Sequence, residues 1–373
     1  MATQKHVLVL GAGVIGLQTA ISLLQSGYNV TVLAKHLPGD ISVEYASPWA
    51  AAMWRSNALP HEQEIQDWDK ESYETWLQEC GPLSKSQSSC LRKGITKVPM
   101  RLLWTGPHDF IPHGPESLWY ALHVQNFRTT SPPELPQGFI HGATHDGIAI
   151  NTTIYLTSLA STVHALGGQI TRVELPTNSG LSGAISHAKS TLRVMGATTS
   201  IDLVVNATGL EAYRLLPDAS VYPIRGQTVT VKGEAEHITT LFYPEANASI
   251  TPRIGSGVSV LGSSYEKGNW ERTPDDAVTM KILERCKPLA PELLNADGEF
   301  AVVSVNVAFR PGRRCGPRLE MEEVVTDAGE TVVVCHEYGH AGGGYQNSFG
   351  SARKVVALVD KWFRKEQISR ARL

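Results

Sequence analysis

The hydrophobic positions of this chain form short continuous runs first and a helical pattern next. Residues 6–10 are almost entirely apolar, which predicts a buried parallel strand. A glycine-containing segment follows, and apolar side chains then recur at helical spacing over residues 17–25, up to Gly27. A second apolar run at residues 30–34 predicts another strand. Strand, helix and strand in this order predict a βαβ unit with a parallel sheet.

The two periodicities continue along the rest of the chain. They predict helices at residues 151–166 and 347–364, and further sheet strands at 169–175, 200–207 and 331–335. Between residues 223 and 307 the apolar runs are short and alternating, which is typical of antiparallel strands; these runs are 227–231, 257–262 and 300–307. The pattern therefore predicts an α/β nucleotide-binding fold that is interrupted by an antiparallel-sheet lobe.

Composition and charge exclude several classes of protein. Of 373 residues, 42% are hydrophobic and 18% charged, so an intrinsically disordered chain is not expected. The formal net charge is -3 and no basic run occurs, so we expect no nucleic-acid partner. No apolar stretch approaches the roughly 18 residues of a transmembrane helix, so we expect no membrane span. A globular enzyme is the class that these features favour.

The cysteines predict neither a metal site nor a disulfide framework. There are five of them, an odd number, without CxxC or Cys/His zinc spacing. We interpret them as ordinary thiols of a reducing compartment, and the sequence leaves a single Cys80–Cys90 bridge open. The sequence does not decide whether the chain forms a homo-oligomer.

The segment after the first strand has the spacing of a dinucleotide-binding loop. It reads Gly11-Ala12-Gly13-Val14-Ile15-Gly16, directly between a strand and a helix. The first glycine permits the tight turn, the second a close approach to a pyrophosphate, and the third close helix–strand packing. The acidic residue that usually ends the second strand is replaced by Lys35, which could contact a ribose or phosphate or lie in solvent. These features predict a dinucleotide cofactor.

Further motifs follow in a characteristic order. They are Ala46-Ser47-Pro48-Trp49-Ala50-Ala51-Ala52-Met53-Trp54, Val204-Val205-Asn206-Ala207-Thr208-Gly209, Arg225-Gly226-Gln227, Gly268-Asn269-Trp270, Phe309-Arg310-Pro311 and Tyr338-Gly339-His340-Ala341-Gly342-Gly343-Gly344-Tyr345-Gln346. With these motifs the chain resembles the FAD-dependent D-amino-acid oxidases, including the D-aspartate oxidases, over nearly its whole length. It is most similar to the fungal members.

The resemblance implies the cofactor, the domains and the cofactor contacts. It implies a Rossmann-like FAD-binding domain at residues 1–55, 146–215 and 311–373, and an interleaved antiparallel-sheet substrate domain at 56–145 and 216–310. The FAD contacts that it implies, beside the glycine loop and Lys35, are Ser47, Trp49, Ala51, Ala52, Val173, Gly342, Gly343, Gly344, Tyr345 and Gln346. A helix N-terminus after the last glycines would stabilise negative charge on the reduced flavin.

The resemblance also implies a substrate site. Arg310 matches the arginine that binds the substrate α-carboxylate, a task that suits a planar guanidinium. Tyr265 matches an active-site tyrosine, and the backbone carbonyl of Gly342 matches the acceptor for the substrate amine. Where the family usually has tyrosine, this chain has Ser249, which predicts a roomier pocket.

Two further arginines raise the question of substrate class. Arg253 and Arg55 lie in segments that border the family's site, and either could receive a side-chain carboxylate or be an exposed charge. Arg253 is the first candidate for this role and Arg55 is the fallback. We therefore expect a modest preference for acidic D-amino acids such as D-aspartate and D-glutamate over neutral ones.

The expected reaction is that of the family. The α-hydrogen of a D-amino acid passes as hydride to the flavin, and water hydrolyses the imino acid to a 2-oxo acid and ammonia. Dioxygen then reoxidises the flavin and yields hydrogen peroxide. The alternatives are a glycine or sarcosine oxidase of the same fold and, in another class, a non-catalytic nucleotide-binding protein.

The two ends of the sequence suggest a location. Apolar residues at the N-terminus run directly into the glycine loop, so we expect no signal peptide. Ala371-Arg372-Leu373 is a variant of the peroxisomal address Ser-Lys-Leu. We therefore expect a peroxisomal protein that is recognised by the peroxisomal import receptor.

Overall fold

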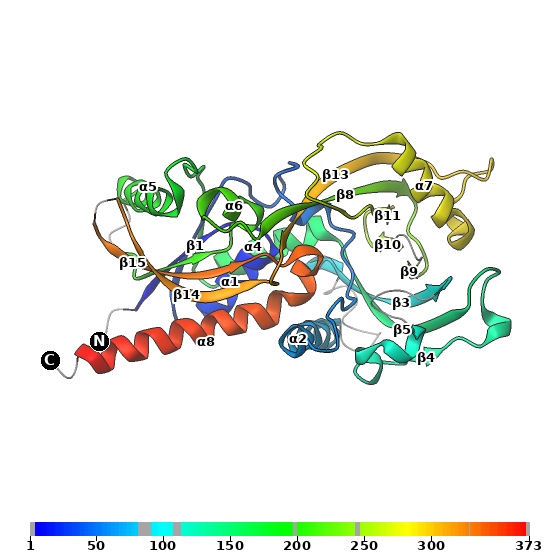
Figure 1. Cartoon of the computed structure of the whole chain (residues 1–373), viewed down its shortest axis with the longest axis horizontal. Coiled ribbons are helices and arrows are strands. Elements are labelled where there is room, and N and C mark those ends of the chain that lie inside the picture. The colour runs from blue at the N-terminus through cyan, green and yellow to red at the C-terminus, as the bar shows by residue number, and fades with distance from the viewer. Residues whose placement is uncertain are drawn as a thin grey trace. The chain divides into compact units, whose positions relative to one another are not determined.

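The computed structural model describes residues 4–80, 91–106, 113–196, 200–242, 247–327 and 329–370 (Figure 1). The chain forms two compact units, each assembled from separate stretches of sequence. Unit 1 comprises Met1–Ser47, Leu156–Pro223 and Arg310–Leu373, and unit 2 comprises Pro48–Tyr155 and Ile224–Phe309. The predicted α/β fold class is confirmed, because a largely parallel sheet and a largely antiparallel sheet are both present.

Unit 1 is built on a six-stranded sheet of order β14-β15-β7-β1-β2-β6. Five strands are parallel: β1 (His6–Leu10), β2 (Asn29–Ala34), β6 (Gln169–Arg172), β7 (Leu203–Asn206) and β15 (Thr331–Tyr338). The sixth, β14 (Arg318–Val325), joins β15 in antiparallel pairing. All five residues of β1 are buried, which explains why its sequence is continuously apolar.

Helices cover the sheet of unit 1. Leu181, Ile185 and Leu192 of α5 (Gly180–Val194) pack in one apolar core with the strand residues Leu8 and Leu10. Figure 1 shows the long α8 (Gly344–Arg370) along the other side of the sheet. The other described helices that lie wholly or mostly in unit 1 are α1 (Val14–Gln25), α4 (Thr152–Ala165), the short α6 (Ala212–Leu215) and the 3₁₀ turns η5 (Gly209–Glu211) and η8 (Ala341–Gly343).

Unit 2 is built on the second sheet, whose order is β12-β8-β11-β10-β9-β3-β5-β4, with β13 paired to β8. The strands are β3 (Ile95–Trp104), β4 (Arg128–Thr129), β5 (His141–Ile150), β8 (Val221–Lys232), β9 (Ile238–Phe242), β10 (Asn247–Arg253), β11 (Val258–Gly262), β12 (Glu266–Lys267) and β13 (Val302–Arg313). Along the order from β12 to β4, neighbouring strands are antiparallel except β3 and β9, which are parallel.

One helix of unit 2 packs its apolar side on this sheet. Ile282 and Cys286 of α7 (Asp276–Cys286) lie in one core with Val229, Leu241 and Ile250 from three strands. The other elements are α2 (Gln63–Cys80) and the 3₁₀ turns η1 (Ser47–Trp49), η2 (Gly114–Ser117), η3 (Trp119–Leu122), η4 (Pro132–Glu134), η6 (Lys287–Leu289) and η7 (Pro291–Leu293).

The structure bears on two further features, membrane-spanning helices and cysteines. None of the helices within the described ranges combines the length and the hydropathy that a bilayer-spanning segment needs. Cys286 and Cys335 are buried free thiols, and burial raises the pKa of Cys286 to about 12. Cys90, and with it the Cys80–Cys90 pairing, lies outside the described residues, as does Ala371-Arg372-Leu373.

Candidate active site

The glycine loop joins the carboxyl end of β1 to the N-terminus of α1. Gly11 has φ +111°, and a Cβ at this position would lie 2.4 Å from the carbonyl oxygen of Ala207, at the end of β7. A Cβ at Gly16 would lie 2.1 Å from the Gly11 carbonyl oxygen. Both positions therefore require glycine, one for the backbone angle and one for the close approach of helix and turn.

The N-terminus of α1 is suited to an anion. Its N-cap residue is Gly13, which offers no side chain to bind the first N–H groups, and the first turn carries no acidic residue. The Val14 N–H donates to the Ser47 hydroxyl at 3.1 Å, and the phenol of Tyr45 donates to the Ala12 carbonyl at 2.7 Å. A helix end with positive dipole and a glycine approach is the usual cradle of a pyrophosphate. The structure thus brings predicted contact Ser47 against the loop.

A second glycine turn, after β15, leads into α8 and lies beside the first. A Cβ at Gly344 would be 3.7 Å from the Val14 side chain, so the N-terminal residues of α1 and α8 are neighbours. The Tyr345 phenol donates to the Ser47 carbonyl at 2.9 Å. Ser47 therefore connects the predicted pyrophosphate loop to the predicted flavin turn through its hydroxyl and its carbonyl. Gln346 is buried in the same first turn.

Arg310 and Gly342 lie together in unit 1. Arg310 is half-buried near the end of β13, and its Cδ would lie 3.7 Å from a Cβ built at Gly342. Gly342 itself is exposed, as is appropriate for a residue that offers its carbonyl to a ligand. The Arg310 side chain therefore passes close to the Gly342 backbone. A guanidinium can bind the carboxylate of an α-amino acid, and a backbone carbonyl can accept from its amine. The sequence predicted these two roles from motifs 32 positions apart.

Lys35 and Val173 follow β2 and β6 at the same carboxyl edge of the sheet. The Val173 N–H donates to the Ala34 carbonyl at 2.9 Å, which continues the pairing of these strands. Lys35 is exposed and pairs with Glu44 at 3.1 Å and Glu174 at 2.7 Å, and these carboxylates raise its pKa. Ligands of open α/β sheets bind at this edge. The cofactor roles of both residues stay predictions.

The segment that carries Trp49, Ala51 and Ala52 is held by backbone contacts within unit 2. The Ile150 N–H donates to the Ala52 carbonyl at 2.9 Å, and the Trp54 N–H donates to the Ile148 carbonyl at 2.8 Å. Ala52 is buried, whereas Trp49 and Ala51 are half-buried. The flavin contacts of Trp49, Ala51 and Ala52 stay predictions.

Arg253 also holds that segment. Its Nη2 donates to the carbonyls of Pro48 at 3.0 Å and Ala50 at 3.3 Å. Ser249 lies four residues earlier in the same strand, β10, and its hydroxyl donates to the Gly262 carbonyl at 2.7 Å. The guanidinium of Arg253 therefore has backbone partners in the chain itself.

Arg55 has a different environment. It is half-buried, its Nη2 donates to Asn57 Oδ1 at 2.6 Å, and its Cζ lies 5.3 Å from the centre of the Phe242 ring. Among the residues that the structure describes, Arg55 forms no ion pair with a carboxylate. Burial lowers the pKa of the guanidinium, which nevertheless stays protonated. A desolvated cation without an acidic partner favours a negatively charged ligand.

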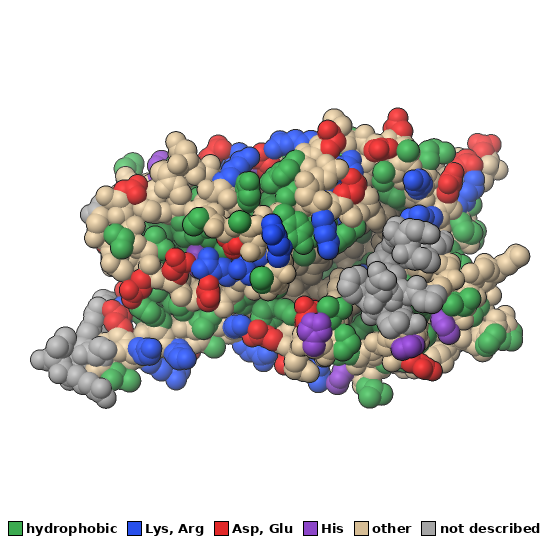
Figure 2. Space-filling view, in the orientation of Figure 1, with side chains coloured by type: hydrophobic (Ala, Val, Ile, Leu, Met, Phe, Trp, Pro, Cys, Tyr) green, Lys and Arg blue, Asp and Glu red, His purple; other side chains and the backbone are tan. Residues whose placement is uncertain are grey.

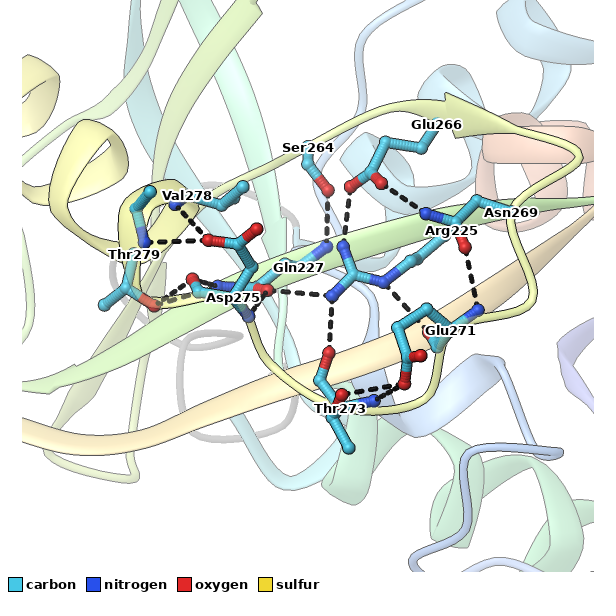
Figure 3. A network of polar contacts seen from close by, with 11 residues as sticks. Arg225, Gln227, Ser264, Glu266, Asn269, Glu271, Thr273, Asp275, Val278 and Thr279 are labelled. Carbon is cyan, nitrogen blue, oxygen red and sulfur yellow. Dashed lines mark hydrogen bonds and ion pairs between the residues drawn. The ribbon is translucent and has the colours of Figure 1, made fainter.

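Tyr265 follows β11 and is 57% exposed in unit 2. The backbone around it is fixed by a dense polar network centred on Arg225 and Gln227, which Figure 3 shows. The sequence identified Arg225 and Gln227 only as carriers of the family resemblance. Since polar residues in a strand usually face solvent, the sequence did not reveal that these two are buried.

Sequence reasoning also missed two polar groups close to the flavin turn. His340 is buried, and its Nδ1 lies 3.3 Å from Asn347 Oδ1. Burial lowers the pKa of His340 to about 4, so the imidazole is neutral at pH 7. Glu337 is also buried and accepts from the Thr19 hydroxyl at 2.6 Å. Because a polar residue in a strand reads as solvent-facing, its burial could not be found from alternation alone.

Comparison with known proteins agrees with this geometry. A family model described as "FAD dependent oxidoreductase" matches residues 6–358. The chain belongs to this family. It is therefore an FAD-dependent oxidoreductase, and FAD is its cofactor. The glycine cradle at α1, which a Cβ would fill, fits that cofactor.

The relatives narrow the family further. The chain is 34% identical to a D-amino-acid oxidase of Fusarium vanettenii, over 95% of this chain and 96% of the relative. It is 32% identical to a D-amino-acid oxidase of Schizosaccharomyces pombe, again over 95% and 96% of the two chains. The predicted resemblance to D-amino-acid oxidases, with fungal ones among the most similar, is confirmed.

Solved structures agree with the fold. Glycine oxidase from Bacillus cereus aligns with a TM-score of 0.65 at 17% identity, covering 96% of this chain and 95% of the other. L-alpha-glycerophosphate oxidase from Mycoplasma pneumoniae, solved with FAD bound, aligns with a TM-score of 0.67 at 15% identity, covering 96% and 95%. At such identities the likeness concerns the fold.

Proposed function

We propose that this FAD-dependent oxidoreductase oxidises D-amino acids, with dioxygen as the final electron acceptor, and releases a 2-oxo acid, ammonia and hydrogen peroxide. The observation that carries the proposal is the position of Arg310 beside Gly342, at the turn that leads into α8. The similarity to D-amino-acid oxidases over 95% of the chain supports the same activity.

The proposed roles follow from the chemistry of each group. Bound FAD supplies the hydride acceptor for the substrate α-carbon. Arg310 binds the α-carboxylate and fixes its orientation with two parallel N–H donors. The carbonyl of Gly342 accepts a hydrogen bond from the amino group, and Tyr265 offers a hydroxyl to the substrate. The N-terminus of α8 would stabilise negative charge on the reduced flavin.

A substrate panel tests the proposal. The purified protein should be yellow, lose its visible absorbance when a D-amino acid is added without oxygen, and release peroxide in air. L-amino acids should give neither response. Preferential oxidation of glycine or sarcosine would instead support the alternative amine oxidase. A colourless protein that ignores every amino acid would support a non-catalytic nucleotide-binding role.

Among D-amino acids, we propose a preference for acidic substrates, with Arg55 as the partner of the second carboxylate. An acidic substrate needs a cation in its pocket, since an unpaired buried charge costs several kcal/mol. Arg253 already donates to the Pro48 and Ala50 carbonyls, whereas Arg55 faces Asn57 and an aromatic ring. The contacts therefore favour Arg55 over Arg253 for this role.

Paired variants test the substrate preference. Arg55→Ala should lower kcat/KM for D-aspartate and D-glutamate relative to D-alanine by about 1–3 kcal/mol, the worth of a charge-assisted hydrogen bond. Arg253→Ala is the control and should affect the three substrates equally, because it removes a backbone contact. A wild-type enzyme that prefers D-alanine, or equal losses in Arg55→Ala, would remove the acidic preference and leave the oxidase proposal standing.

We further propose that the protein works in peroxisomes and that the import receptor recognises Ala371-Arg372-Leu373. A product such as hydrogen peroxide suits that compartment.

A further inference from the structure

The segment between β11 and α7 combines exposed aromatic side chains with a tightly held backbone. Tyr265 is 57% exposed and Trp270 is 45% exposed. Beneath them, two polar side chains of β8 are almost completely buried: Arg225 is 2% exposed and Gln227 is 0% exposed. Figure 3 shows both pointing into the loop that this segment forms.

Arg225 holds three parts of the segment at once. Its Nε donates to the Glu271 carbonyl at 2.9 Å, and its Nη2 donates to the Thr273 carbonyl at 2.7 Å. Its Nη1 donates to the carboxylate of Glu266 at 2.6 Å. One rigid guanidinium thus fixes the residue directly after Tyr265 and the return of the chain towards α7.

Gln227 fixes both ends of the same segment. Its backbone N–H donates to the Ser264 hydroxyl at 3.0 Å, immediately before Tyr265. Its side-chain amide donates to the Asp275 carbonyl at 2.7 Å and accepts from the Asp275 N–H at 2.8 Å. The same amide also donates to the Thr279 hydroxyl at 2.8 Å, in the first turn of α7.

Glu266 is held ionised by this arrangement. Burial acts to raise the pKa of its carboxyl, but hydrogen bonds from Ser264, Asn269 and Arg225 outweigh burial and lower the pKa. One carboxylate oxygen accepts from Arg225 and the other accepts from Asn269 at 2.6 Å. The negative charge next to Tyr265 is therefore paired within the network, which leaves it little capacity to repel an anionic substrate.

We propose that Arg225 and Gln227 are positioning residues that set the place of Tyr265 for substrate binding. The inference rests on the proposed oxidation of D-amino acids, because it assigns Tyr265 to that substrate. Its physical basis is that a side chain on an exposed loop is placed only as well as its backbone is held. Here the flanking residues Ser264 and Glu266 are each bonded to a buried partner in β8.

The first experiment compares two arginine variants with D-alanine as the substrate. Arg225→Lys keeps the charge but loses the fork, and should raise KM by about tenfold to a hundredfold while the flavin content stays unchanged. Arg101→Lys is the matched control in unit 2, where Arg101 donates to the Leu289 carbonyl at 2.8 Å, away from the segment. Its KM should stay within about twofold, at a similar loss of thermal stability.

Two milder variants keep the test available if Arg225→Lys does not fold. Asn269→Ala removes one bond to Glu266, and Thr279→Val removes one acceptor of Gln227. Each should raise KM by about twofold to tenfold, less than Arg225→Lys. An unchanged KM in these variants, or equal KM values for Arg225→Lys and Arg101→Lys, would overturn the proposal.

The second experiment asks whether the effect passes through Tyr265. Repeated in a Tyr265→Ala background, Arg225→Lys should change KM by less than about twofold, because the group that it positions is gone. An effect as large as in the wild-type background overturns the positioning role, and so does a Tyr265→Ala enzyme with the wild-type KM. If the wild-type protein releases no peroxide with any D-amino acid, the proposed function itself has failed, and this outcome is distinct from both.

Discussion

Arg310 is the residue on which the proposed chemistry depends most. It lies beside Gly342 at the start of the turn into α8, where a guanidinium can bind a carboxylate with two bonds. We expect Arg310→Ala to keep FAD and to lose about 2–5 kcal/mol of transition-state stabilisation, the cost of truncating a hydrogen-bonded charge pair. Arg310→Lys should recover only part of the loss, because lysine lacks the fork.

The measurement is kcat/KM with D-alanine, together with the flavin spectrum. Arg314→Ala is the matched control, since Arg314 is an exposed arginine that donates to the Ala219 carbonyl. Near-normal turnover in Arg310→Ala would reject the assignment of the α-carboxylate to Arg310.

For single residues, the sequence predicted a role where the residue belongs to a motif. It predicted no role where a residue acts through a contact with a distant part of the chain. Arg310 and Gly342 were predicted from two separate motifs and lie together. The engagement of Arg253 with the Pro48 carbonyl joins positions more than 200 residues apart in the chain. Nothing in the local pattern around Arg253 encodes that partner, so its contacts had to come from the structure.

Glu337 gives a prediction about pH. It is buried in β15, and desolvation raises the pKa of its carboxyl from 4.5 to about 8. The folded protein therefore keeps this proton up to about pH 8, whereas the unfolded chain releases it above about pH 4.5. The free energy of unfolding that this group contributes then decreases with rising pH across this window, by up to about 1.4 kcal/mol per pH unit.

The test is to measure unfolding midpoints of the holoenzyme between pH 5.5 and 8, roughly the range in which the protonation of Glu337 should affect stability. Glu337→Gln, which is neutral at every pH, should flatten the decline that the wild type shows. Glu323→Gln, an exposed carboxamide on β14, should leave the decline unchanged. A wild type and a Glu337→Gln variant with parallel pH profiles would show that Glu337 is ionised in the folded protein.

Among the elements, the turn between β1 and α1 makes the sharpest prediction. Gly13 has φ -73° and ψ 177°, a backbone conformation that other residues adopt readily, so glycine is needed there for space. A Cβ at this position would lie 3.1 Å from the Ser47 hydroxyl. Gly13→Val should therefore give a folded protein that is colourless or loses FAD on dilution, because valine fills the approach to the pyrophosphate.

FAD retention after gel filtration is the measurement. Gln25→Val, an exposed β-branched substitution at the other end of α1, controls for helix propensity. Tight FAD in a folded Gly13→Val protein would show that the phosphates bind elsewhere.

The sequence predicted elements whose buried residues form a simple hydrophobic pattern. The first strand was predicted at residues 6–10 and is β1 (His6–Leu10), because a fully buried parallel strand is continuously apolar. α2 (Gln63–Cys80) was missed, since its buried face is built from Trp68, Tyr73 and Trp76 amid charged residues. α5 was also missed, although Leu181, Ile185 and Leu192 on its buried side have helical spacing.

For the molecule as a whole, charge and composition indicated the class of protein but did not identify its substrate. Lys and Arg total 33 and Asp and Glu total 36, and Figure 2 shows the two signs interspersed on one face. The net charge of -3 predicts no nucleic-acid partner, and this expectation stays a prediction. The fold class could be predicted because the order of strand-like and helix-like hydrophobic patterns can be read along the sequence. Substrate preference could not, because it depends on a few contacts between distant segments.

The predicted cellular location of the whole protein depends on its last three residues. Ala371-Arg372-Leu373 follows α8, whose last turns carry charged residues. A receptor-read address acts without any role in the fold, so its removal should leave catalysis intact. We expect an N-terminally tagged protein lacking these residues to be cytosolic and the full chain to be peroxisomal, with equal kcat/KM for both in vitro. Replacing Leu373 with Lys should have the effect of the deletion, while a change of Ile368 to Val should have none. Unchanged import of the shortened chain would show that the address lies elsewhere, and the proposed oxidase activity would be unaffected by that result.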